Sequence, residues 1–341
     1  MMKYLLGANE NFYKACMHTH STVSDGIHDP EDVKRHYMQH GYSIVAFTDH
    51  NVLVPHPELK DDNFLPITSY EFAIPSGGSG PLCKVFHMNL YAKEEMNDVQ
   101  VCLDSTAYVV DQDKEHLKHI KYTGKDQYLP YCPESVNKVI REAHKHGFLT
   151  CYNHPAWSNE TIFDFIQYNG YQFFEVFNTG SHYSVKNTIT EWNLRDFHTL
   201  LKMGHRVYPI FADDAHIISE TDGPYSLAFK GYIMINAPKL EYSAVIRALE
   251  AGDFYASMGP EIKAIYLEDN KFCVHTSDAA EIRIVTAGRN GVRVAAEPGS
   301  TVHYAEHVLI PGTYDFVRVE VLDSQGKIAI SRGYFEDELE A

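Results

Sequence analysis

The chain has 341 residues, 44% of them hydrophobic, so it can bury a full core in one large domain and a smaller one. Its formal net charge of -17 disfavours nucleic acids and anionic membranes as partners. No apolar run reaches the roughly 20 residues of a membrane span, and the N-terminus lacks a signal-peptide core, which predicts a cytoplasmic protein.

The first predicted unit is a helix followed by a strand that ends in a polar cluster. Asp29 is a suitable N-cap, Pro30 favours the first helical turn, and Gly41 ends the helix. The apolar strand at 43–47 then leads into a Thr-Asp-His cluster at 48–50. An earlier strand, at 15–18, runs into the similar cluster His-Thr-His at 18–20.

The same unit recurs twice. A helix from Pro133 stops at Gly147, and a strand at 148–152 leads to Asn-His-Pro at 153–155. A third helix, from about 189 to 203, precedes a strand at 206–212 and the cluster Asp-Asp-Ala-His at 213–216. Further strands are predicted at 65–71, 84–91, 173–177 and 232–235, and a helix at 243–251. A polar, weakly periodic insertion at 92–130 interrupts the pattern, and helix is the structure we expect for it.

This alternation of strands and helices predicts a parallel β/α architecture, in which chemistry gathers at the carboxyl ends of the strands. From residue 259 the helical period disappears, and short strands separated by turn residues indicate a β-sandwich. We therefore expect a barrel domain at 1–258 and a β-sandwich domain at 259–341, which packs on the barrel or mediates a homo-oligomer. Binding of a carbohydrate or a protein partner is the alternative role. The expected strands are 262–267, 271–275, 281–286, 292–296, 316–322 and 327–331.

The polar clusters supply nitrogen and oxygen atoms suited to divalent cations. Residues two apart on a strand point to the same side, so His18 and His20 can reach one cation, and so can Asp214 and His216. Each cluster alone fits a structural role equally well, but their shared position at strand ends favours a metal cluster. The nine candidate ligands are His18, His20, Asp25, His50, Glu71, His87, His154, Asp214 and His216.

These motifs, in this order, resemble the polymerase-and-histidinol-phosphatase (PHP) superfamily of metal-dependent phosphoesterases over roughly residues 14–258. The resemblance implies a distorted (β/α)7 barrel with a trinuclear metal centre. It assigns His18, His20, Glu71 and Asp214 to the first metal, Glu71 (as a bridge), His87 and His154 to the second, and Asp25, His50 and His216 to the third. Many members have histidine where this chain has Asp25, which predicts a weaker third site or one that prefers a harder ion.

The resemblance implies hydrolysis of a small phosphomonoester or phosphodiester, such as a nucleotide or sugar phosphate, by a hydroxide that bridges the metals. Glu71, Asp25 and His216 are the expected catalytic residues, and two or three zinc, manganese or iron ions fit the mixed ligand set. Asp49 and Asn153 are expected to orient imidazoles. Candidate substrate contacts, each of which also fits a solvated surface residue, are His182, Lys186 and Lys230.

Two other classes of function stay open. An amidohydrolase or deaminase also begins with H-x-H on a barrel strand, but it usually needs a metal-bridging lysine or a late-strand aspartate as the base. No lysine lies at a suitable strand end, and Asp214 is assigned to a metal. A non-catalytic regulatory or carbohydrate-binding module would have lost several ligands, whereas all nine are present.

Overall fold

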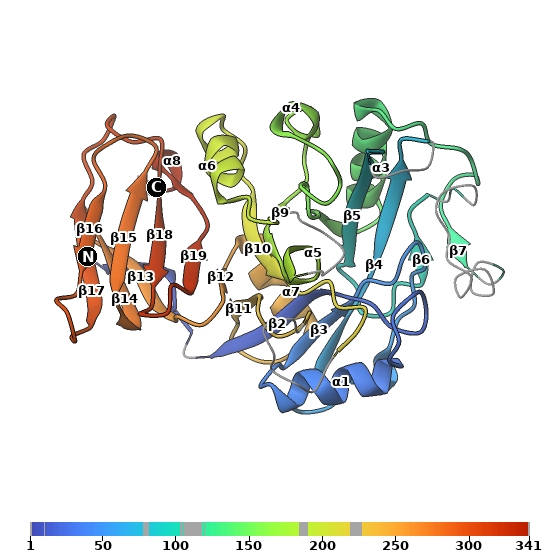
Figure 1. Cartoon of the computed structure of the whole chain (residues 1–341), viewed down its shortest axis with the longest axis horizontal. Helices are drawn as coiled ribbons and strands as arrows, with labels where there is room; N and C mark the ends of the chain where they lie inside the picture. The colour runs from blue at the N-terminus through green and yellow to red at the C-terminus, as the bar shows by residue number, and fades with distance from the viewer. Residues whose placement is uncertain are drawn as a thin grey trace.

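A computed structural model describes residues 2–9, 11–77, 82–102, 104, 118, 120–183, 190–218 and 227–339. The chain is a mixed α/β protein with two visibly different parts (Figure 1). Helices accompany the strands in the larger part, and the smaller part, drawn in orange and red, consists almost entirely of strands. Within the described ranges, no helix is both long and apolar enough to cross a membrane.

The larger part is built on strands of one 14-stranded sheet. β2, β3 and β4 are parallel to one another, as are β8, β9 and β10, while β5 lies between β4 and β8 and is antiparallel to both. A parallel bridge between Thr19 and Ala215 connects the end of β2 to the segment after β10. The strands are β2 (Phe12–Thr19), β3 (Ile44–Phe47), β4 (Leu65–Pro75), β5 (Val85–Ala92), β8 (Phe148–Tyr152), β9 (Phe173–Asn178), β10 (Tyr208–Ala212), β11 (Tyr232–Asn236) and β12 (Phe254–Ser257).

The helices of this part follow the predicted caps and buried faces. Asp29 caps α1 by accepting a hydrogen bond from the Asp32 amide, and α3 buries the apolar side chains Val136, Val139, Ile140 and Ala143, which recur at helical spacing. The third helix begins five residues later than predicted, because Trp192 extends the chain in a bridge to Phe177. The helices are α1 (Pro30–Gln39), α3 (Pro133–Lys145), α4 (Ile162–Phe165), α5 (Thr179–Tyr183), α6 (Leu194–Lys202) and α7 (Tyr242–Ala251), with a 3₁₀ turn at Pro57–Leu59.

Two expectations for the middle of the chain need correction. β5 is antiparallel rather than parallel, since it returns from β4 as a hairpin. For the same reason Glu71 does not end its strand: pairing with β5 carries β4 on to Pro75, and Glu71 lies opposite Asn89. The described residues of the 92–130 insertion form only the short parallel pair β6 (Val99–Gln100) and β7 (Lys121–Tyr122), and residues 103, 105–117 and 119 lie outside the description.

The smaller part consists of two sheets that share a hydrophobic core. One sheet has the order β1-β13-β14-β17, and the other continues from β12 through β19, β18 and β15 to β16. All six strands expected after residue 259 are confirmed, and β17 was missed because four of its seven side chains are polar and only Ala305 is buried. The first strand of the chain belongs to this part, since β1 pairs with β13. The remaining elements are β1 (Met2–Leu6), β13 (Ile262–Glu268), β14 (Lys271–Ala279), β15 (Glu281–Thr286), β16 (Val292–Ala295), β17 (Val302–Val308), β18 (Phe316–Leu322), β19 (Ile328–Ser331), β20 (Tyr334–Phe335) and α8 (Glu336–Leu339).

Candidate metal centre

The structure brings all nine predicted ligands into one cluster. Their donor atoms form overlapping groups whose members lie within 4.8 Å of one another. Neighbouring backbones explain the convergence: the Asp214 amide donates to the His18 carbonyl at 2.9 Å, and a parallel bridge pairs His50 with Glu71. The groups are His18, His20 and Asp214; His18, Glu71 and His154; His50, Glu71 and His87; and His20, Asp25, His50 and His216.

The first group has the size of a cation site. His18 Nε2 lies 3.3 Å from His20 Nε2 and 3.3 Å from Asp214 Oδ1, and His20 Nε2 lies 3.0 Å from the same oxygen. Ligand atoms placed tetrahedrally at about 2.0–2.1 Å from a zinc ion are roughly 3.3 Å apart, so a small divalent cation fits among these three atoms. The Nε2 atoms of His18 and His20 also face each other at 3.3 Å. This arrangement suits two ligands of one shared cation better than a structural hydrogen bond.

Glu71 joins this group to a second one. Its Oε1 atom lies 3.4 Å from His18 Nε2, 3.0 Å from His87 Nδ1 and 3.2 Å from His154 Nε2. Its Oε2 atom lies 3.0 Å from His50 Nδ1. The Glu71 carboxylate is fully buried and therefore occupies the position expected of a ligand shared between two cations.

The third group forms the open side of the cluster. Asp25 Oδ2 lies 3.3 Å from His216 Nε2 and 3.7 Å from His50 Nε2, and the rings of His20 and His216 stack at 4.0 Å. The side chains of Asp25 and His216 are 25% and 34% exposed, whereas Glu71 is 1% exposed. His20 and His50 each belong to two groups, so the nine residues do not separate into three exclusive sets. A substrate would approach the cluster over Asp25 and His216.

The backbone is strained at two of the candidate ligands. His154 and Asp214 have φ angles of 22° and 52°, a region that non-glycine residues rarely adopt. Such strain persists only where the surroundings enforce it, and it is typical of functional sites. The loop that carries Asp25 approaches β2 equally closely: a Cβ at Gly26 would lie 2.6 Å from the His20 carbonyl, so only glycine fits there.

A buried carboxylate that was not among the predicted site residues supports the cluster from behind. Glu175, on β9, places Oε1 2.7 Å from His18 Nδ1, and its Oε2 accepts hydrogen bonds from the His154 amide and from Asn178 Nδ2. A carboxylate on the outer nitrogen of an imidazole fixes the tautomer that leaves the inner nitrogen free for a metal. The sequence did offer a signal for Glu175, because a single acidic residue within an otherwise apolar strand needs a buried partner.

The expected roles of Asp49 and Asn153 need correction, because the described partners of the Asp49 carboxylate are serines and Asn153 donates to a carboxylate. Asp49 accepts bonds from the amides and hydroxyls of Ser21 and Ser24 and so holds the loop that carries Asp25. Asn153 donates to Glu71 Oε1 at 2.7 Å and orients the carboxylate instead.

Asp213, the neighbour of Asp214, is fully buried outside the cluster. It accepts hydrogen bonds from the Thr179 hydroxyl and from the amides of Phe229, Lys230 and Gly231. Burial raises the pKa of its carboxyl. This residue therefore fastens the 229–231 segment to the end of β10.

The titration behaviour of the cluster reflects three carboxylates enclosed among six imidazoles. Burial opposes protonation of His154 and His216, but hydrogen bonds with Glu71 and Asp25, respectively, raise the pKa of each to about 9. Burial and the charges of His216 and His50 lower the pKa of His20 to about 4. Despite burial, the imidazoles hold the pKa of Glu71 well below its usual range. Protons therefore balance the buried negative charge, and divalent cations could take their place.

The two candidate substrate contacts that the structure describes, His182 and Lys230, lie against aromatic side chains. His182, on α5, packs against Phe177 and Tyr183, with ring centroids 5.3 and 4.7 Å away, and lines a hollow between the two parts of the molecule. The Lys230 ammonium lies 3.9 Å from the centre of the Tyr183 ring. Lys186 lies outside the described residues.

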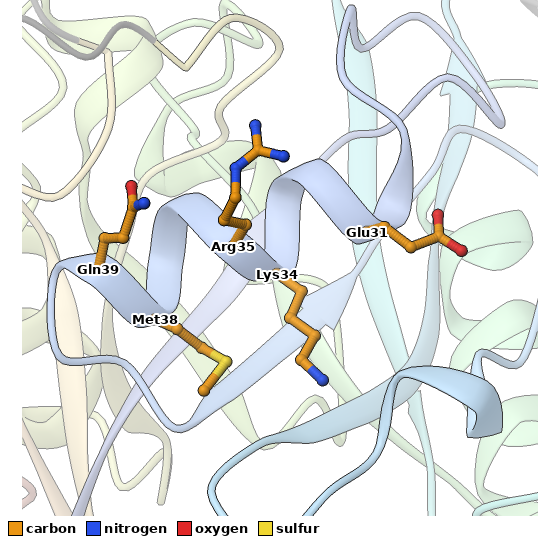
Figure 2. A pocket seen from close by; sticks show the side chains of 5 residues that line it. All are labelled: Glu31, Lys34, Arg35, Met38 and Gln39. Atoms are coloured by element: carbon orange, nitrogen blue, oxygen red, sulfur yellow. The ribbon is translucent and has the colours of Figure 1, made fainter.

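Another hollow lies over the outer face of α1, and Figure 2 shows the side chains that line it. It contains none of the nine ligand candidates, and its two basic side chains pair locally: Lys34 with Asp61, and Arg35 with Asp32. Ion pairs of this kind are common on protein surfaces, and we assign no function to this face.

No protein-family model matches the chain, and no curated protein matches its sequence. Among solved structures, it is similar to a two-domain protein from Bacteroides vulgatus that contains a predicted PHP-like metal-dependent phosphoesterase, with 13% identity, 95% of each chain covered and a TM-score of 0.47. An inferred metal-dependent phosphoesterase from Bifidobacterium adolescentis matches with 14% identity, 61% of this chain and 90% of that chain covered, and a TM-score of 0.40.

An amidohydrolase from Chromobacterium violaceum, with bound sulfate and no metal, matches with 15% identity, 70% of this chain and 96% of that chain covered, and a TM-score of 0.40. These proteins share little sequence with the chain, so the assignment of a function rests on the geometry of the site.

Proposed function

We propose that the chain is a member of the PHP superfamily that hydrolyses small phosphate esters with two or three divalent cations. The observation that carries this proposal is the convergence of six imidazoles and three carboxylates from six separate stretches of sequence. Their donor atoms lie at separations that suit shared cations. A structural polar cluster would instead pair each carboxylate with groups that carry their own protons.

In this proposal Glu71 bridges the first two cations, and Asp25 and His216 hold the third at the solvent side. Bound cations would supply positive charge and Lewis acidity to a phosphoryl group and to a water molecule. The chain positions them: Glu175 holds His18, Asn153 holds Glu71, and Asp49 holds the loop of Asp25. Zinc, manganese and iron all fit the ligand set, and the oxygen ligand from Asp25 favours manganese in the third position.

The contacts of the acidic residues favour phosphate esters over amides. Within the described part of the chain, every ion pair to Asp25, Glu71 or Asp214 comes from a histidine, and no lysine takes the place of a metal-bridging residue. Asp213, the remaining late-strand carboxylate, is occupied by backbone and hydroxyl donors. Among these residues, therefore, neither a metal-bridging lysine nor a free late-strand aspartate is available to serve an amidohydrolase.

We further propose that the strands β2, β3, β4, β5, β8, β9 and β10 form the distorted seven-stranded barrel of that superfamily. The Thr19–Ala215 bridge supports closure between the first and last of them. Residues 259–341 form the second domain in this proposal, with β1 added to it by its pairing with β13. We propose that this domain packs on the barrel or joins two copies of the chain.

The test is a metal-dependent screen. Purified protein should contain two to three equivalents of divalent cation by elemental analysis and should release phosphate from small phosphomonoesters or phosphodiesters. Activity should disappear in chelator and return when manganese is added. A metal-loaded protein that cleaves amides and no phosphate ester would replace this proposal with the amidohydrolase alternative.

A further inference from the structure

One aromatic side chain lies between the cluster and solvent. The Trp157 ring packs against two candidate ligands of the second cation, 5.3 Å from the His87 ring and 5.0 Å from the His154 ring. Those two histidines are buried, whereas Trp157 is 37% exposed. The indole therefore packs on two candidate ligands of the second cation and leaves part of its own surface open to solvent.

The position of this indole is fixed by the backbone beneath it. The amides of Ala156 and Trp157 donate to the two oxygens of Glu191, at 3.1 and 2.7 Å, and Glu191 is fully buried. At the end of the same loop, Glu160 accepts hydrogen bonds from three tyrosine hydroxyls at 2.5–2.6 Å. A surface held in this way can bind a planar group with little loss of conformational entropy.

Two more apolar side chains are exposed close in sequence to the open ligands Asp25 and His216. Ile27 and Ile217 are 60% and 49% exposed. The Ile27 amide donates to the His216 carbonyl at 3.0 Å, so the two isoleucines lie on neighbouring backbone segments. Single exposed apolar residues are ordinary on protein surfaces, and these two add apolar surface near the open ligands.

The cluster and the indole together suit a phosphate ester with a ring in its leaving group. The candidate ligands would hold cations that bind one phosphoryl group, and the Trp157 ring lies beside two of those ligands, so the leaving group of a bound ester can reach the indole.

We propose that Trp157 is a specificity-determining residue that stacks on an aromatic ring in the leaving group of a monophosphate ester. This inference rests on the proposed function, because it places the phosphate on the metal cluster. Aryl and nucleoside monophosphates share the required chemistry, a planar unsaturated ring on the ester side. Stacking of a base on an aromatic side chain typically contributes enough free energy to change affinity by about tenfold or more.

The experiment compares kcat/KM for 2-naphthyl phosphate, adenosine 5′-monophosphate and glycerol 2-phosphate in metal-loaded protein. Trp157→Ala should lower kcat/KM for at least one aromatic ester about tenfold, relative to glycerol 2-phosphate, and Trp157→Phe should restore most of the loss. Whether the naphthyl or the adenosine ester responds more distinguishes the two sources of the ring. Phe163→Ala is the matched control, since Phe163 is 81% exposed on α4 and should leave all three values unchanged.

A role in merely supporting His87 and His154 would give a different result. Trp157→Ala would then lower the metal content, or reduce all three esters by the same factor, and the proposal would be overturned. An unchanged ratio with full metal content would overturn it as well.

A binding measurement separates this inference from the proposed function. In a Trp192→Phe background Trp157 is the only tryptophan of the chain, and 2-naphthyl phosphonate should quench its fluorescence where methyl phosphonate does not. Selective quenching without hydrolysis of any phosphate ester would uphold the aromatic subsite and remove the phosphatase proposal. Hydrolysis of phosphate esters without selective quenching would support the phosphatase proposal and overturn the aromatic subsite.

Discussion

Two sets of buried carboxylates in the larger part of the molecule meet different partners. Glu71 is surrounded by the ring nitrogens of His18, His50, His87 and His154. Glu160 is also buried, yet it accepts hydrogen bonds from the hydroxyls of Tyr131, Tyr152 and Tyr168. Hydroxyl donors bring their own protons and satisfy a carboxylate completely, whereas converging imidazoles leave lone pairs that only protons or cations can satisfy.

This difference separates scaffold from site. Asp49, Glu191 and Asp213 resemble Glu160, because backbone amides and hydroxyls occupy their oxygens. Asp25 and Asp214 resemble Glu71, because their close charged neighbours are imidazoles. Burial of an acid alone therefore does not identify a metal ligand; the convergence of several imidazoles on it does, whereas Glu175 pairs with only one.

Glu71→Gln should have the largest effect on metal binding and turnover, and it tests whether Glu71 differs from a scaffold acid such as Glu160. The amide removes a charge shared by two cation sites, so metal content should fall and turnover of a phosphate ester should drop by about 1,000-fold or more. Elemental analysis and steady-state kinetics measure both. Unchanged metal content and rate would show that Glu71 is a scaffold acid like Glu160.

Asp25→Ala should reduce turnover by about 100-fold, because the third cation contributes to holding the phosphoryl oxygens. Metal content should fall by about one equivalent, while the first two groups stay loaded. Asp25→His should shift the metal preference towards zinc. The matched control is Asp61→Ala, which removes a surface carboxylate paired with Lys34. Wild-type turnover in Asp25→Ala would favour a two-metal scheme.

The pH dependence of metal binding tests whether protons occupy the imidazoles around the carboxylates before a metal binds. In the cation-free protein the pKa values of His154 and His216 are raised to about 9, so both rings are largely protonated at pH 7. A metal needs the neutral imidazole, so binding at pH 7 should release protons, and affinity should rise about tenfold per pH unit for each proton displaced, levelling off near pH 9. Calorimetry in buffers of different ionisation enthalpy measures the release. Binding without proton release would contradict this prediction.

Glu160→Gln should have the smallest effect. The glutamine replaces one acceptor oxygen with a donor group, so the free energy of unfolding should fall by about 1–3 kcal/mol and Tm by several degrees. Metal content should equal that of the wild type, since no candidate ligand contacts Glu160 in the recorded hydrogen bonds. Loss of metal in this variant would erase the distinction between the two sets of acids.

Local sequence determined much of what was predicted correctly. The caps of α1, the buried stripe of α3 and the strands from 262 to 331 follow from periodicity and turn residues, which act within a few positions. The His18–His20 and Asp214–His216 spacings place two ligands on one side of a chain segment. The antiparallel course of β5 escaped prediction, because an apolar strand reads the same in both directions.

Only the tertiary structure decided which side chains meet across the sheet. Glu175 contacts His18 although 157 positions separate them in the sequence. Trp157, which follows β8, packs on His87, which lies on β5. The two-residue spacing to His216 favours Asp214 over Asp213 as the ligand, but the amides of Phe229 and Gly231 that hold Asp213 are set by the fold alone. Sequence periodicity specifies the direction of a side chain within its own element. The partners of that side chain depend on how distant strands align, and that alignment is a property of the folded sheet.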